Sequence, residues 1–197
     1  MHAVAHPHAR PDLYRPGVGA VLVSTWRVGT PERQRAAVEA VRRAWESREW
    51  PDPGLLSYSI YAGTDGDTLL HYSQWTGEGV YEDFVRTHRD DRNAEIDAAV
   101  PGIERVVLHR YAPPRPAGAP GPDALPGAVP VVPVVPVVSV VESGGGDAVA
   151  AGGAGTHVHR SADGTRVLVL TEWEDVPPAG PADARWYVPA LSLGAGA

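Results

Sequence analysis

The sequence contains no cysteine, one methionine and one phenylalanine in 197 residues. Without cysteine there is no disulfide framework, no thiolate nucleophile and no thiolate-based metal site. Lysine and arginine are not concentrated in runs, and the formal net charge is −7. Because phosphate binding needs concentrated positive charge, nucleic acid is not an expected partner.

Long hydrophobic runs are also missing. The longest apolar stretch, residues 127–141, carries three prolines and is too short to cross a bilayer. Residues 1–17 lack the apolar core of a signal peptide and are broken by prolines. We therefore expect a cytoplasmic protein without a membrane partner, and we expect residues 1–17 to form a flexible tail.

The sequence contains a weak internal repeat. Residues 54–75 read GLLSYSIYAGTDGDTLLHYSQW, and residues 152–173 read GGAGTHVHRSADGTRVLVLTEW. Aligned without a gap, the two segments share an Asp-Gly pair and a final tryptophan, Trp75 or Trp173. Asp-Gly suits a tight turn because both residues tolerate positive φ. Each segment predicts a β-hairpin, and together they predict a duplicated unit.

The first unit, residues 18–112, reads as an α+β domain. Thr30-Pro31-Glu32 predicts a helix start, since a hydroxyl N-cap is followed by proline and by an acid in the first turn. The predicted order is strand, helix, strand, strand, helix, strand, which is the ferredoxin-like arrangement. The corresponding segments are a strand at 19–28, a helix from Thr30 to about Glu49, the hairpin at 54–75, helical stretches from Glu78 and over 89–100, and a strand at 103–111.

The second unit looks shortened. Residues 113–126 are rich in proline, alanine and glycine and predict a linker. Residues 127–197 form the second copy, which has too few residues to keep both helices. A sheet with helices on one face leaves its other face bare, and a second sheet can cover it. We expect a tandem pseudo-dimer with a helix-poor second half and one functional site, in the first unit.

The first hairpin and the helix after it resemble a known family. The residues that carry the resemblance are Gly54-Leu55-Leu56-Ser57, the Asp65-Gly66 turn, Tyr72, Gln74-Trp75, and Tyr81 six positions after that tryptophan. Together they resemble the antibiotic biosynthesis monooxygenase superfamily of dimeric α/β barrels, particularly its members from aromatic polyketide pathways. The resemblance covers residues 19–111 well and 127–193 weakly.

The resemblance implies a cofactor-independent monooxygenase. Family members oxidise anthrone-like phenols to quinones with O₂ and use neither flavin nor metal, so the implied partners are a small aromatic substrate and O₂. Trp75 and Tyr81 match the family pattern, whereas His71 stands where the family has asparagine. His71, Trp75 and Tyr81 are therefore the candidate catalytic residues.

The candidate residues allow specific roles to be assigned. His71 and Trp75 lie on one face of their strand, because they are separated by an even number of residues. A neutral imidazole can accept a proton near neutral pH, so we expect His71 to take the phenolic or benzylic proton of the substrate. The imidazole can also hold an oxyanion once one nitrogen is protonated. We expect the Trp75 indole N–H to orient the substrate or O₂, and the Tyr81 hydroxyl to bind the substrate oxygen. The candidate substrate-binding residues are Trp26, Phe84 and His88.

Several alternatives stay open. A polyketide cyclase needs the same flat pocket and acid–base groups but no O₂. Haem degradation occurs in the same superfamily, although the asparagine of those relatives is replaced by His71. A non-catalytic small-molecule-binding or assembly protein is the third possibility. His157 and His159 are only two potential ligands, so no metal site is expected. A monomeric pseudo-dimer is the simplest oligomeric state, with a homodimer as the alternative.

Overall fold

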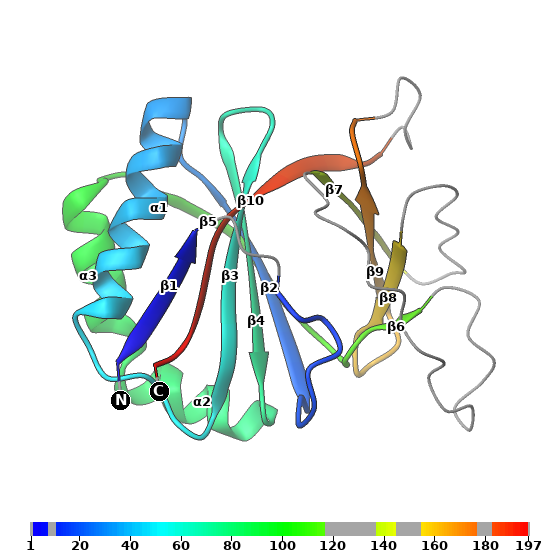
Figure 1. The fold of residues 1–197 in the computed structure, drawn as a ribbon, viewed down its shortest axis with the longest axis horizontal. Helices are drawn as coiled ribbons and strands as arrows, with labels where there is room; N and C mark the ends of the chain where they lie inside the picture. Colours follow the sequence, from blue (N-terminus) through cyan, green and yellow to red (C-terminus); the bar gives the residue numbers. More distant parts are fainter. Residues whose placement is uncertain (1, 8–10, 117–136, 145–154, 177–182, 197) are drawn as a thin grey trace.

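The computed structural model describes residues 2–7, 11–116, 137–144, 155–176 and 183–196. These residues form three helices, which are α1 (Pro31–Glu46), α2 (Glu78–Thr87) and α3 (Arg89–Ala99) (Figure 1). The strands are β1 (Ala3–Pro7), β2 (Ala20–Arg27), β3 (Leu55–Gly63), β4 (Thr68–Trp75), β5 (Glu104–Tyr111), β6 (Arg115–Pro116), β7 (Val137–Gly144), β8 (Gly155–Arg160), β9 (Arg166–Trp173) and β10 (Arg185–Ala195). Among the described residues, no helix has the length and hydropathy needed to cross a membrane.

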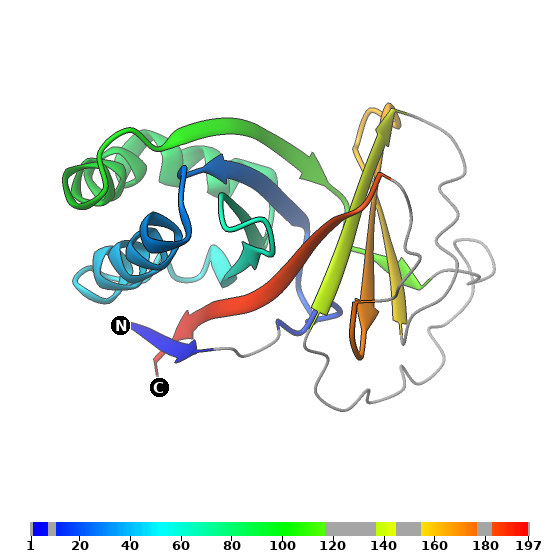
Figure 2. The ribbon, with the colours of Figure 1, turned by 90° about the horizontal axis from the view of Figure 1, so that it is seen from above.

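The first unit has the predicted ferredoxin-like order of strands. Its sheet runs β5-β2-β4-β3, with every neighbouring pair antiparallel. The three helices lie on one side of this sheet, and β7, β8 and β9 lie on the other side (Figure 2). The sequence-based order of strand, helix, strand, strand, helix, strand is confirmed, with the second helical region divided into α2 and α3.

Helix α1 begins where the sequence indicated. The Thr30 side chain accepts a hydrogen bond from the Arg33 backbone N–H at 3.3 Å, and proline occupies the first turn. The helix buries Val41 and Trp45 against the sheet. It ends at Glu46, slightly before the expected end, and places the Trp45 ring among the aromatic rings described below.

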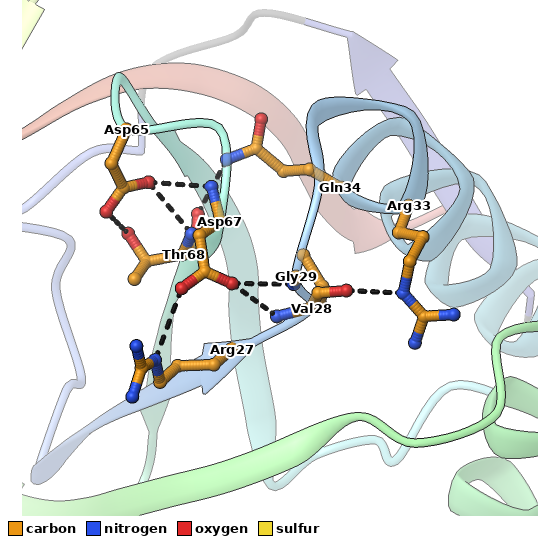
Figure 3. Close-up of polar contacts among 8 residues, drawn as sticks. All are labelled: Arg27, Val28, Gly29, Arg33, Gln34, Asp65, Asp67 and Thr68. Carbon is orange, nitrogen blue, oxygen red and sulfur yellow. Dashed lines mark hydrogen bonds and ion pairs between the residues drawn. The ribbon is translucent and has the colours of Figure 1, made fainter.

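The first hairpin turn is fastened to the start of α1 by polar contacts (Figure 3). Gly66 has a φ of 73°, which confirms the expected positive-φ turn. The Asp67 carboxylate accepts from the backbone N–H groups of Val28 at 3.2 Å and Gly29 at 2.6 Å. The Gln34 side-chain amide donates to the carbonyl oxygen of Gly63 at 2.9 Å. These bonds hold the strand-to-helix connection against the hairpin.

The second half repeats the strand order of the first. Its strands run β10-β7-β9-β8, which corresponds position by position to β5-β2-β4-β3. The described residues after β6 contain no helix, and the connections at 145–154 and 177–182 lie outside the described residues, so the expected loss of the helices stays a prediction. Strand β10 pairs with β7 at Arg185–Tyr187 and with β3 over Tyr187–Leu193, so it belongs to both halves.

The two edge strands of the sheet, β5 and β6, are connected directly along the chain. Strand β6 follows β5 closely in sequence and pairs with β8, and the Ala112 N–H donates to the Arg160 carbonyl at 2.9 Å. The two halves of this sheet enclose an apolar core between them. Residues of both halves in this core are Val21, Val23, Leu70 and Tyr72 from the first and Val138, Val140, Leu168 and Leu170 from the second. Strands β7 and β9 therefore help to cover the helix-free face of the first unit, as expected, but among the described residues they belong to the same continuous sheet and not to a separate second sheet.

Two expectations about connecting segments need correction. Residues 3–7 are not a flexible tail, because they form β1 and pair antiparallel with β10. Arg115 and Pro116 belong to β6 rather than to a linker, and they pair with Val158 and His157. Residues 117–126 of the expected linker lie outside the described residues, as do residues 127–136 at the start of the expected second copy.

Candidate active site

A cavity of about 390 Å³ lies between the first sheet and the three helices. Such a volume is within the range of small-molecule sites. Its walls are mainly aromatic and aliphatic, and its polar groups include three arginines but no carboxylate. The lining residues are Leu22, Ser24, Trp26, Trp45, Tyr58, His71, Ser73, Trp75, Tyr81, Phe84, Arg89, Arg92, Asn93, Ile96, Arg105, Val106, Val107 and Leu108.

His71 lies in the wall formed by β4. Its side chain is 3% exposed, and its ring centroid is 4.0 Å from that of Trp26. The Nδ1 atom is 2.5 Å from the Tyr58 hydroxyl. The Nε2 atom is buried and has no hydrogen-bond partner among the described residues. Unpaired buried polar atoms are rare in folded proteins, so this atom marks a place where a ligand atom could bind.

The protonation state of His71 follows from its surroundings. Burial, and secondarily the positive charge of Arg105, lower the pKa of His71 from 6.5 to about 3. The imidazole is therefore neutral at neutral pH. Proton uptake by His71 becomes favourable only if a negative charge enters the cavity, because no carboxylate lines it.

Trp75 follows His71 on the same face of β4, as predicted from strand alternation. It is 2% exposed, and its ring packs against Tyr81 and Phe84, each with a centroid separation of 5.2 Å. Its indole N–H donates to the Ser73 hydroxyl at 2.9 Å. The expectation that this N–H faces the substrate or O₂ is thus not met in the structure. Trp75 contributes an aromatic wall to the cavity.

Tyr81 and Phe84 enter the cavity wall from one face of α2, which agrees with their helical spacing. The Tyr81 ring packs edge-on against Trp75 and lies under the Arg110 guanidinium, 5.8 Å from the ring centroid. The Phe84 ring stacks on Trp45 with centroids 5.6 Å apart and an angle of 14° between planes. These contacts bring residues from α1, α2 and β4 together.

Of the six residues predicted to form the site, His88 is the one absent from the cavity wall. It ends α2 with a φ of −136°, so it no longer follows the helical phase of Tyr81 and Phe84. Its ring lies 6.3 Å from that of Phe84, and its carbonyl oxygen accepts a hydrogen bond from Arg92 at 3.1 Å. His88 therefore supports lining residues and is not itself a substrate contact in this structure.

The arginines give the cavity its positive character. Arg92 is 4% exposed, donates to the Glu49 carbonyl at 2.7 Å and lies over the Trp45 ring at 4.7 Å. Burial lowers its pKa to about 10, so it remains charged at neutral pH. Arg105 lies 4.6 Å from the Trp26 centroid and pairs with Asp97 at 3.0 Å. An anionic or oxygen-rich ligand suits this arrangement.

Four further residues line the cavity that were not predicted from the sequence, namely Tyr58, Trp45, Arg92 and Arg105. Tyr58 could have been found from the hairpin register, because it pairs with Ser73 and so lies diagonally beside His71. Arg105 is the register partner of Trp26, but that register contains a bulge. Arg92 had no comparable signal, since α3 reads as a polar surface helix.

Buried polar residues of the second half lie away from the cavity. The Tyr14 hydroxyl is 2.7 Å from His157 Nδ1, and His157 Nε2 is 3.3 Å from a Glu172 carboxylate oxygen. His159 Nδ1 is 3.2 Å from the Ala112 carbonyl oxygen. No group of three or more potential metal-ligating side chains occurs in the part of the chain that the structure describes. The contacts observed for both histidines are with protein groups.

Comparisons with known proteins identify the fold. No family model and no curated protein matches the sequence. An anthrone oxidase-like protein matches over 98% of each chain with a TM-score of 0.61 and 15% identity. A candidate monooxygenase from Lactobacillus acidophilus NCFM matches over 89% of this chain and 96% of its own, with a TM-score of 0.51 and 7% identity. A monooxygenase from the gene ActVA-Orf6 of Streptomyces coelicolor, solved with nanaomycin D, is 30% identical, with coverage of 56% of this chain and 100% of its own and a TM-score of 0.42. At the identities of the first two, the likeness is one of fold: this chain has the α+β fold of the anthrone oxidase-like protein over nearly its whole length.

Proposed function

We propose that the protein is a cofactor-independent monooxygenase of the antibiotic biosynthesis monooxygenase superfamily, which oxidises an anthrone-like phenol with O₂. The observation that carries this proposal is the aromatic-walled cavity with the unpaired Nε2 of His71 and with arginines but no carboxylate in its wall. Flat aromatic walls suit a polycyclic substrate, and the positive charge suits its phenolate. The shared fold with an anthrone oxidase-like protein supports the same reading.

The proposed reaction is balanced by the substrate and O₂ alone. The anthrone gives up a proton to water as it binds, and the resulting electron-rich anion transfers electrons to O₂. The CH₂ carbon loses both hydrogens, one oxygen atom becomes the new quinone carbonyl, and the other leaves as water. The protein has to bind the ring system, stabilise the anion and exclude bulk water.

Each cavity residue has a place in this scheme. Trp26 and Phe84 hold the faces of the ring system, and Trp75 forms an aromatic wall beside the reacting carbon. His71 binds the substrate oxygen through Nε2, and the Tyr81 hydroxyl provides a second hydrogen bond. Low exposure of these side chains favours the reaction, because electrostatic interactions are stronger where water is excluded.

We also propose that the second half is a degenerate copy of the first and that the chain is a monomeric pseudo-dimer. The identical strand order of the two halves and the apolar core between them support this interpretation. In the gap-free alignment Val169 stands opposite His71, so the second half has no counterpart of the proposed chemistry. Sedimentation equilibrium should give the mass of one chain, whereas twice that mass would mean a homodimer.

Oxygen consumption tests the proposed function. The protein, stripped of metal and flavin, is mixed with a hydroxyanthrone in an oxygen electrode. We expect uptake well above the spontaneous rate, and we expect His71→Ala to lower kcat/KM roughly a hundredfold, as for loss of a group that stabilises a developing anion. Trp75→Phe should reduce the rate, and Trp173→Phe, at the corresponding position of the second half, should not.

The same experiment separates the alternatives. Tight binding of the hydroxyanthrone without O₂ uptake above the spontaneous rate would contradict the oxygenase. It would favour a cyclase or a binding protein, and turnover of a linear polyketide without O₂ would then identify the cyclase. A shift of the Soret band on mixing with haem would instead indicate a haem-binding protein.

A further inference from the structure

The contact between Tyr58 and His71 links two neighbouring strands at the cavity wall. Tyr58 on β3 pairs with Ser73 of β4, and His71 pairs with Ile60, so Tyr58 and His71 are diagonal neighbours on one face of the hairpin. Their polar atoms, the Tyr58 hydroxyl and Nδ1 of His71, are 2.5 Å apart. Both residues line the cavity.

The chemistry of the two groups decides which one donates. A phenol has one proton to donate, and a neutral imidazole has one N–H and one acceptor nitrogen. Among the described residues, Nδ1 of His71 is the hydrogen-bond partner found for the Tyr58 hydroxyl. If Nδ1 carried the proton, it would donate to Tyr58, and the phenol proton would lack an acceptor in a buried place. If Tyr58 donates, its proton is satisfied and the imidazole N–H lies on Nε2.

The surroundings oppose the alternative in which both ring nitrogens are protonated. The titratable and charged groups that line the cavity with His71 are Tyr58, Tyr81, Arg89, Arg92 and Arg105. None of them is an anion at neutral pH that could stabilise an imidazolium. Burial lowers the pKa of His71 and raises that of Tyr58, so both groups stay neutral.

We propose that Tyr58 is a positioning residue: by donating to Nδ1 it holds His71 in the tautomer with the proton on Nε2, and His71 then serves as a hydrogen-bond donor to the substrate oxygen. This inference rests on the proposed oxygenase and assigns His71 the anion-stabilising role rather than that of a base. The Trp26 ring, 4.0 Å from the imidazole, restricts rotation of the His71 ring and so keeps Nε2 in place. A buried N–H without a partner gains most from an acceptor that carries negative charge.

The tautomer can be measured without any activity. In protein labelled with heavy nitrogen in histidine, two-bond proton–nitrogen correlation spectra distinguish a protonated from an unprotonated ring nitrogen. The signals of His71 are those lost in His71→Asn. We expect Nε2 to be protonated and Nδ1 unprotonated at neutral pH. A protonated Nδ1 would overturn the inference.

Variants of β3 supply the matched comparison. Tyr58→Phe should convert His71 to a mixture of tautomers, while Tyr61→Phe, on the opposite face of the same strand, should leave the tautomer unchanged. An unchanged tautomer in Tyr58→Phe would show that the phenol does not control it and would overturn the positioning role. If Tyr58→Phe does not fold, the spectrum of the unmodified protein still decides between the tautomers.

The donor role is tested with a product-like probe. Addition of a dihydroxyanthraquinone should shift the Nε2–H resonance of His71 if its oxygen accepts from that group, and an unshifted resonance with the probe bound in the cavity would contradict the donor role. In the oxygenase assay, Tyr58→Phe should lower kcat about fivefold to tenfold, with little change in KM. The expected tautomer together with absent O₂ uptake would contradict the proposed function alone, so the two failures are distinguishable.

Discussion

The ring of Trp26 lies against the ring of His71, with centroids 4.0 Å apart and planes inclined at 37°. On β2 and β5, Trp26 pairs with Arg105, whose guanidinium lies 4.6 Å from the Trp26 centroid. Trp26 therefore connects the positive charge of Arg105 with the proposed catalytic imidazole. The orientation of His71 depends on this contact as well as on its hydrogen bond to Tyr58.

Replacing Trp26 with a smaller aromatic residue should lower the activity without abolishing it. We expect Trp26→Phe to lower kcat/KM for a hydroxyanthrone by about 2- to 10-fold, the size of an aromatic pair interaction. The matched control is Trp173→Phe, because the Trp173 ring also packs against an aromatic ring, that of Trp186, with centroids 5.6 Å apart in the second half. Equal losses in the two variants would contradict a specific role for Trp26.

Alanine substitutions in the two hairpin turns separate the destabilising effect of backbone strain from that of steric overlap. Gly66 and Gly164 have φ values of 73° and 69°. A Cβ atom at Gly66 would lie 2.7 Å from the Pro31 ring, whereas nothing lies within 4 Å of one at Gly164. Gly164→Ala should lower the free energy of unfolding by about 1–2 kcal/mol through strain. Gly66→Ala should lower it by about 1–3 kcal/mol more, because the Pro31 ring is rigid.

Urea unfolding of both glycine variants measures this difference. A larger loss in Gly66→Ala would mean that the hairpin turn packs as closely against the Pro31 ring as the distance of 2.7 Å indicates. Equal losses would contradict that packing.

Buried neutral histidines should make the fold sensitive to acid. Burial lowers the pKa of His71 from 6.5 to about 3, and that of His159 from 6.5 to about 4. Below pH 6.5 the unfolded chain binds a proton at each of these residues that the folded chain does not bind, so stability is lost as the pH falls towards the folded pKa. We expect His71→Asn to reduce the pH dependence of the unfolding free energy by one proton in this range. An unchanged slope would contradict the low pKa of His71.

Local features of the sequence predicted the first unit well. The start of α1 follows from Thr30 and Pro31, and the turn follows from Asp65-Gly66, because each depends on residues close together in the chain. The second half was harder to predict, because strand β10 pairs both with β7 and with β3 of the first unit, and such long-range pairing leaves no local signal. Strand β1 is the clearest case: its pairing with β10 joins the two ends of the chain, which no local pattern indicates.

The candidate site was predictable where a single element places several residues. Strand alternation placed His71 and Trp75 in one wall, and helical spacing placed Tyr81 and Phe84 in another. The prediction for His88 was wrong as a lining residue because α2 ends before it. The Trp75 N–H donates its hydrogen bond to the Ser73 hydroxyl, and strand alternation does not determine the conformation of that side chain.

The measurement that tests the central claim most directly is the fate of isotopically heavy O₂ in a single turnover. The protein, freed of metal and flavin, is mixed with a hydroxyanthrone under heavy O₂ and quenched rapidly, and the quinone is analysed by mass spectrometry. We expect one heavy oxygen atom in the quinone and the other in water, with labelling lost in His71→Ala. A quinone without the heavy isotope, or one formed equally fast in that variant, would contradict direct oxygenation in this cavity.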